Sequence, residues 1–71
     1  MARSYYIWEI EFEDGKKIYV LARDISQILN SDNEEIEKYD FDCIIRIEQL
    51  ELAQSWTFDE YENLIDLHYD D

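Results

Sequence analysis

The chain has 71 residues, of which 46% are apolar and 15% aromatic, and its 19 acidic and 6 basic residues give a net charge of −13. This charge argues against direct binding to nucleic acid, which is itself a polyanion. The apolar fraction excludes a disordered acidic tail, because disorder requires low hydrophobicity together with high charge. We therefore expect one folded domain over residues 1–71, with far more charge than the magnitude of about 2–8 that keeps a small domain soluble.

The short length makes the fold marginal. A chain near this size buries only about 60% of the surface that it exposes when unfolded. Its single cysteine cannot form an internal disulfide, and the sequence contains no metal-ligand or cofactor-binding motif. We therefore expect a homodimer without metal or cofactor, because oligomerisation is the remaining way to stabilise so small a scaffold. We expect a cytoplasmic protein, because the sequence has no cysteine framework and no signal peptide. We also expect that it does not enter a membrane, because it has no apolar run of ~20 residues.

The first predicted element is a β-hairpin. Over residues 6–13 one set of apolar side chains alternates with a second set that consists of Ile7 and three glutamates, which is the period of a strand. Asp14-Gly15 follows and favours a two-residue type I′ turn, and residues 16–21 supply the second strand. A two-residue loop fixes three pairs on the core face, namely Phe12 with Lys17, Ile10 with Tyr19, and Trp8 with Leu21. Ile18 and Val20 would then share the other face with the glutamates and need cover, for which we consider a second subunit.

The middle of the chain predicts a short helix and a third strand. Asp24 followed by Gln27 is typical of a capping box before a helix over residues 25–29. Residues 34–38 fit either one more helical turn or an acidic loop. Residues 41–52 are expected to form the central strand of the sheet, because residues 43–47 are almost continuously apolar.

The C-terminal segment predicts a second helix. Thr57 and Glu60 have the spacing of a capping box, and Trp56 and Tyr61 that of a hydrophobic staple. The helix would run to about Leu67, although residues 64–69 could instead pair as an edge strand. The resulting order is ββαβα, an α+β domain with a small antiparallel sheet.

Clustered carboxylates are the main candidate for function. Residues two apart on one face of a strand lie about 6.7 Å apart, similar to the spacing of phosphates along a DNA strand. A protein surface that neutralises phosphates with Lys and Arg could bind such an array for the same electrostatic reason. The alternative is a solvated face that only keeps the protein soluble. The predicted phosphate-mimicking residues are Glu9, Glu11, Glu13, Asp14, Glu34, Glu35 and Glu37.

Catalytic and metal-binding patterns are weak. Cys43 is expected to be a buried structural residue in mid-strand, since a nucleophilic thiolate needs an electropositive and accessible site. His68, the only histidine, has neither a glycine-rich loop nor an oxyanion hole near it in the sequence. Residues 32–35 lack the glycine and the spacing of a calcium loop. We therefore expect no catalytic residue, no metal site and no enzymatic activity.

The combination of short length, strong acidity, many aromatic residues and no catalytic motif resembles the phage-encoded DNA-mimic inhibitor proteins. The order hairpin, helix, strand over residues 5–52 is also similar to small dimeric phage inhibitors of uracil-DNA glycosylase. These proteins share no sequence motif, so the resemblance assigns no residue. Lys16, Lys17, Arg23 and Arg46 interrupt the acidic surface.

The resemblance implies that the chain occupies the basic DNA-binding surface of a host protein in the cytoplasm of an infected bacterium. An HU-type nucleoid protein is the favoured target, because a long basic surface suits a dimer with two acidic arrays. The next candidates are DNA-processing or defence enzymes such as uracil-DNA glycosylase or a CRISPR or restriction nuclease. An alternative from another class is an antitoxin or adaptor that binds its partner through an apolar groove.

Overall fold

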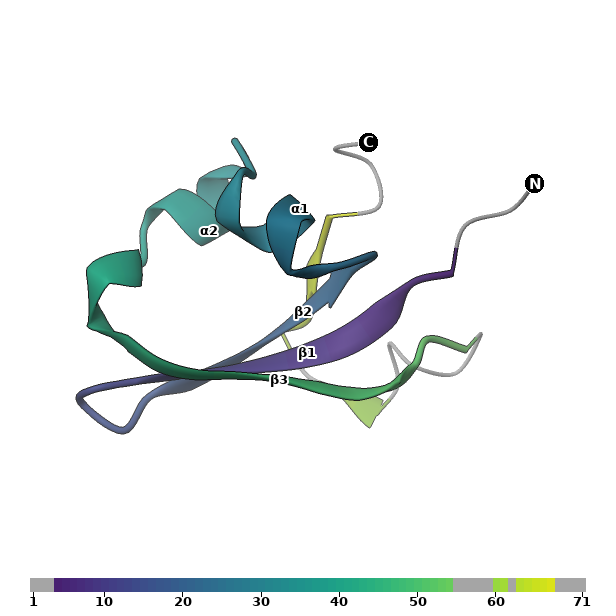
Figure 1. Cartoon of the computed structure of the whole chain (residues 1–71), viewed down its shortest axis with the longest axis horizontal. Coiled ribbons are helices and arrows are strands. Elements are labelled where there is room, and N and C mark those ends of the chain that lie inside the picture. Colours follow the sequence, from purple (N-terminus) through teal and green to yellow (C-terminus); the bar gives the residue numbers. More distant parts are fainter. Residues whose placement is uncertain (1–3, 55–59, 62, 68–71) are drawn as a thin grey trace.

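The computed structural model describes residues 4–54, 60–61 and 63–67. Within these residues the chain forms an α+β fold in which a four-stranded sheet has the order β3-β1-β2-β4, and two short helices lie over one face of the sheet (Figure 1). The elements are β1 (Tyr6–Phe12), β2 (Lys17–Ala22), α1 (Ile25–Leu29), α2 (Glu34–Glu37), the 3₁₀ turn η1 (Phe41–Cys43), β3 (Ile44–Leu52) and β4 (Ile65–Asp66). The predicted fold class is confirmed.

The hairpin loop contains three residues, 13–15, rather than the predicted two. The Phe12 N–H donates to the Lys16 carbonyl at 2.9 Å, and the Gly15 N–H donates to the Phe12 carbonyl at 2.9 Å. Gly15 has a φ of 88°, in the left-handed region that glycine adopts without steric cost. A turn followed by a left-handed residue is a common three-residue hairpin loop. The added loop residue shifts β2 by one position relative to β1, so the predicted register was wrong.

The shifted register exchanges the two faces of β2, because side chains alternate along a strand. Ile10 lies opposite Ile18, and Ile18 and Val20 are buried in the core. Lys17 and Tyr19 therefore lie on the opposite face, in the positions that had been expected for Ile18 and Val20. Helices α1 and α2 of the same chain cover the core face, so Ile18 and Val20 need no cover from a second subunit.

The hydrophobic core lies between the sheet and the helices. Strands β1 and β2 supply alternate residues, and each helix contributes one fully or almost fully buried isoleucine, Ile28 from α1 and Ile36 from α2. The buried core residues are Trp8, Ile10, Phe12, Ile18, Val20, Ala22, Ile28, Ile36, Ile65 and Leu67. Two residues on the opposite face, Ile7 and Leu21, are also buried.

Helix α1 begins at the predicted cap. The Asp24 side chain accepts the Gln27 N–H at 2.9 Å, which satisfies one of the free donors of the first turn. The Gln27 side-chain carbonyl accepts the Arg23 N–H at 2.7 Å, and its amide donates to the Leu67 carbonyl at 2.9 Å. Buried Gln27 therefore connects α1 to the C-terminal segment. Of the two alternatives for residues 34–38, the helical turn is correct. Helix α2 spans Glu34–Glu37 and has Asn33 as its N-cap.

Strand β3 lies at the edge of the sheet rather than at its centre, and it starts at Ile44 after η1. Its pairing with β1 is interrupted at Ile45 and at Leu50, each of which is an extra residue on β3. Ile45 is 58% exposed and Leu50 38%. The apolar run over residues 43–47 thus reflects a 3₁₀ turn and a bulge, not a strand covered on both faces, and this prediction was wrong.

The C-terminal segment adds a strand where a helix running to Leu67 was predicted. In β4, Ile65 pairs with Val20 and Asp66 with Leu21 in parallel orientation, so the sheet is mixed rather than antiparallel. Asn63, with a φ of 58°, is not in a helical conformation, so no helix continues through it to Leu67. The edge-strand alternative is correct for residues 65–66, while the predicted cap and staple at residues 56–57 fall outside the described part of the chain.

Candidate functional site

The sheet separates the predicted phosphate-mimicking residues into two groups. Glu9 and Glu11 alternate with core residues of β1, so they project from the face opposite the helices. The three glutamates of α2 lie on the helix side, where Ile36 packs into the core. Glu13 and Asp14 lie in the hairpin loop at one end of the sheet. The seven carboxylates therefore do not form one continuous row.

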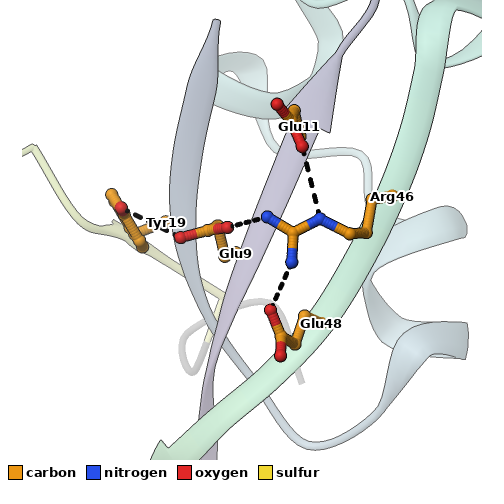
Figure 2. Close-up of polar contacts among 5 residues, drawn as sticks. All are labelled: Glu9, Glu11, Tyr19, Arg46 and Glu48. Atoms are coloured by element: carbon orange, nitrogen blue, oxygen red, sulfur yellow. Dashed lines mark hydrogen bonds and ion pairs between the residues drawn. The ribbon is translucent and has the colours of Figure 1, made fainter. Parts of the chain in front are cut away.

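On the face opposite the helices, Arg46 binds three glutamates (Figure 2). Its Nη2 pairs with Glu9 Oε1, its Nη1 with Glu48 Oε2, and its Nε with Glu11 Oε1 at 3.3 Å. The strand register explains this arrangement, because Glu11 lies opposite Arg46 and Glu9 opposite Glu48 across β1 and β3. We call Arg46 with these three glutamates the Arg46 cluster. The hydrogen bond to Glu11 and the neighbouring carboxylates raise the pKa of Arg46 above its usual value.

The cluster uses both oxygens of Glu9. The Tyr19 hydroxyl donates to Glu9 Oε2 at 3.1 Å (Figure 2), while Oε1 is held by Arg46. The Glu9 side chain is only 13% exposed and that of Glu11 25%. Burial, and then the bond to Glu9, raise the pKa of Tyr19. One guanidinium against three carboxylates leaves the cluster with net negative charge, but the bound oxygens of Glu9 and Glu11 are occupied within the chain and are less available to a partner.

The remaining predicted carboxylates gather at one end of the molecule. Figure 1 shows the hairpin loop, η1 and α2 on the same side of the chain. The loop is joined to η1 by the Glu13 N–H, which donates to the Cys43 carbonyl at 2.9 Å. All the carboxylate residues of these segments are exposed. We call them the acidic end, which consists of Glu13, Asp14, Glu34, Glu35, Glu37, Asp40 and Asp42.

A hollow of about 280 Å³ lies within the acidic end. The Phe12 and Tyr39 rings stack with their centroids 5.5 Å apart, and Lys16 Nζ lies 5.5 Å from the Tyr39 centroid. Lys38 pairs with Glu35 at 3.0 Å. A ligand here would therefore meet aromatic rings and two lysines among the carboxylates. The hollow is lined by Phe12, Glu13, Asp14, Lys16, Lys38, Tyr39, Asp40 and Cys43.

Cys43 lies at the end of η1 and is half-buried, so the prediction of a buried cysteine in mid-strand was wrong. Its thiol donates to Asp40 Oδ2 at 3.5 Å. This hydrogen bond, burial and the negative charges of nearby acidic residues all raise the pKa of the thiol. Because the thiolate is the nucleophile, this environment suppresses the reactivity of Cys43.

A second polar contact connects the C-terminal segment to β3. The Tyr61 hydroxyl donates to Glu51 Oε1 at 3.3 Å, and the Tyr61 ring lies against Tyr19 with centroids 5.2 Å apart. Burial, followed by interaction with Glu51, raises the pKa of both Glu60 and Tyr61. The Glu51 side chain therefore favours the protonated form of Glu60.

The role of Arg46 was not predicted from the sequence. The available signal was a single arginine in a strand expected to pair with a strand of alternating glutamates. Asp40 and Asp42 were also left out of the predicted site, although they follow the acidic segment directly in the chain. Among the described residues, no three His, Cys, Asp or Glu side chains are grouped so that they could hold a metal ion.

Comparison of the chain with protein-family models, curated proteins and solved structures found no match. In the described ranges no helix has both the length and the apolar character needed to span a membrane.

Proposed function

We propose that this protein is a DNA-mimic inhibitor that occupies the basic DNA-binding surface of a host DNA-binding protein and blocks DNA binding. It would act in the cytoplasm of an infected bacterial host. An HU-type nucleoid protein is the favoured target, and DNA-processing or defence enzymes such as uracil-DNA glycosylase or a CRISPR or restriction nuclease form the next class.

The acidic end is the observation that carries this proposal. Its seven carboxylates are exposed, and two lysines, Lys16 and Lys38, lie among them. A DNA-binding surface is built to neutralise phosphates with Lys and Arg, and much of its affinity comes from this electrostatic term. Exposed carboxylates gathered at one end of the fold can satisfy the same cations, so the acidic end supports competition with DNA.

The Arg46 cluster supports the proposal in a different way. It fixes β3 against β1 on the face opposite the helices, and η1 leads directly into β3. The Arg46 cluster therefore helps to hold the segment that carries Asp40 and Asp42 beside the hairpin loop. In this scheme Glu9 and Glu11 are structural residues, and the phosphate-mimicking role passes to the exposed carboxylates.

The proposal is tested by competition with DNA. A labelled DNA duplex bound to purified HU-type protein is titrated with the chain, and fluorescence anisotropy reports the displacement of the duplex at several salt concentrations. A mimic displaces the duplex, and its affinity falls steeply with salt because counterions compete for the same charges. A partner bound through an apolar groove, as an adaptor or antitoxin would be, gives little dependence on salt.

Two matched triple variants locate the binding surface. The first, Glu13→Gln, Glu34→Gln and Glu37→Gln, removes three charges from the acidic end. The second, Glu48→Gln, Glu51→Gln and Glu60→Gln, removes three charges from β3 and the segment after it. We expect the first variant to weaken binding and reduce its dependence on salt, and the second to change both much less. Equal effects in two folded variants would show that only the total charge matters and would remove the acidic end from the proposal.

A further inference from the structure

Strand β3 has a free edge. In the part of the chain that the structure describes, β3 pairs with β1 on one side and with no strand on the other. It is nine residues long, the longest strand described. Three apolar residues of β3 are exposed, Ile45 at 58%, Leu50 at 38% and Leu52 at 46%. A long edge strand with exposed apolar residues is a template for pairing with another chain.

The edge is only partly protected. Natural edge strands are blunted by charged residues and bulges, and β3 has bulges at Ile45 and Leu50. Between them the stretch Arg46–Gln49 keeps a regular register with β1. Its two charged side chains, Arg46 and Glu48, have opposite signs and are paired within the Arg46 cluster, but they remain 43% and 52% exposed, so a partner strand can still meet them. They select a partner strand with the complementary order of charges.

We propose that a second copy of this chain pairs with β3 in antiparallel orientation about a two-fold axis at Ile47. The charge pattern of the strand selects this centre. An axis at Arg46 would place two arginines opposite each other, and an axis at Glu48 would oppose two glutamates. An axis at Ile47 places Arg46 opposite Glu48 of the second copy, and it does so twice because of the symmetry. Opposite charges facing each other across strands stabilise pairing, and like charges oppose it.

The same register brings two of the three exposed apolar residues of β3, Ile45 and Leu50, into the interface. Ile44 lies opposite Leu50 of the second copy, and Ile45 lies opposite Gln49. With the axis perpendicular to the sheet, each face of one copy continues into the same face of the other. The result is one continuous sheet with all helices on one side. Because the strands are antiparallel, the two acidic ends lie at opposite ends of the dimer.

The net charge of −13 on each copy opposes this association, so salt should strengthen it by screening the repulsion. This dependence has the opposite sign to that expected for binding of a basic target. The dimer can therefore be measured without any target, and its failure would be distinguishable from failure of the proposed function.

The test measures the mass of the pure chain by sedimentation velocity over a range of concentrations at low and high salt. Ile45→Lys places a charge on the free edge at an exposed position, and Leu29→Lys makes the matched change at a residue of α1 that is 54% exposed. We expect a dimer that tightens with salt and that Leu29→Lys retains. Ile45→Lys should weaken it at least ~10-fold, because the interface would bury a charge in place of an apolar side chain. Circular dichroism checks that both variants fold.

Cross-linking tests the register. In a Cys43→Ser background, Ile47→Cys places two thiols directly opposite each other across the axis, within reach of a disulfide. Gln49→Cys places its thiol opposite Ile45 and should cross-link far less. A monomer at every concentration and salt tested would overturn the proposal. So would a dimer that Ile45→Lys leaves intact, or one that cross-links through position 49 rather than 47.

Discussion

At the scale of single residues, Arg46 determines how the glutamates on the face opposite the helices are arranged. Exposed ion pairs usually contribute little to stability, but here one guanidinium is shared by three carboxylates, of which Glu9 is mostly buried. Without Arg46 these carboxylates would face each other with no counter-charge. The role of Arg46 is therefore to make an otherwise repulsive arrangement of glutamates compatible with the strand register.

We expect Arg46→Gln to lower the melting temperature, and to lower it more at low salt than at high salt. The reason is that repulsion among Glu9, Glu11 and Glu48 is screened as the ionic strength rises. Thermal unfolding followed by circular dichroism at two salt concentrations measures both effects. Lys38→Gln, which removes the same charge from an exposed pair with Glu35, is the control and should shift the melting temperature less. Equal shifts would show that only the net charge changed.

Glu60 gives a prediction about pH. Its folded-state pKa is raised by burial and by Glu51, so its protonated form is favoured in the fold. The associated stability is present at low pH and is lost as the pH rises through the folded pKa. Glu60→Gln should therefore raise the melting temperature at pH 7, and the advantage over the wild type should shrink as the pH falls. Glu34→Gln on α2 is the control, and a gain of equal size there would contradict the assignment to the contact with Glu51.

At the scale of elements, the hairpin loop decides the register of the sheet. Asp14-Gly15 predicts a hairpin, but the same two residues fit loops of two or three residues, and only the three-residue loop places Ile18 and Val20 with the core residues of β1. The three-residue loop is therefore favoured because it buries the apolar residues of β2. At the other end of the chain, pairing of Ile65 with Val20 overrides the helical spacing of the sequence.

Gly15→Ala should destabilise the protein by about 1 kcal/mol, since a side chain disfavours the left-handed conformation. A Cβ at this position would meet no atom within 4 Å, so the cost comes from the backbone alone. Gly15→Asn should lose less, because asparagine tolerates this region better. Denaturant unfolding measures both variants. A neutral Gly15→Ala would show that the loop adopts a different turn in solution.

At the scale of the whole molecule, electrostatic repulsion acts across the full length of the chain. The molecule measures 36 × 23 × 18 Å, and the screening length is about 30 Å at 0.01 M salt but about 8 Å at 0.15 M. At low salt nearly all charges interact with one another, while near physiological salt only neighbours do. The fold therefore tolerates a charge of −13 because repulsion is spread over its surface and screened.

Raising the salt concentration from 0.01 M to 0.15 M should raise the melting temperature, because the net repulsion of the folded state is screened. Differential scanning calorimetry at constant pH measures the shift. NaCl and KCl should give the same result if screening is the cause. A difference between the two salts would indicate that a particular cation binds to the carboxylates, and a flat response would show that repulsion does not limit stability.

The sequence alone determined the α+β class, the hairpin, the Asp24 cap and the acidic character of the surface. These features depend on local periodicity, on capping chemistry and on composition, which are properties of neighbouring residues. The sequence also located the acidic segments at residues 13–14 and 34–37. It did not show that the sheet separates them from Glu9 and Glu11.

Only the tertiary structure decided the loop length, the edge position of β3, the strand at residues 65–66 and the pairing of Arg46 with three glutamates. Each of these depends on which distant residues lie opposite each other, and a shift of one residue exchanges the faces of a strand. The sequence therefore determines how many charges the chain carries, whereas the strand register decides which of them pair within the chain and which remain exposed to a partner.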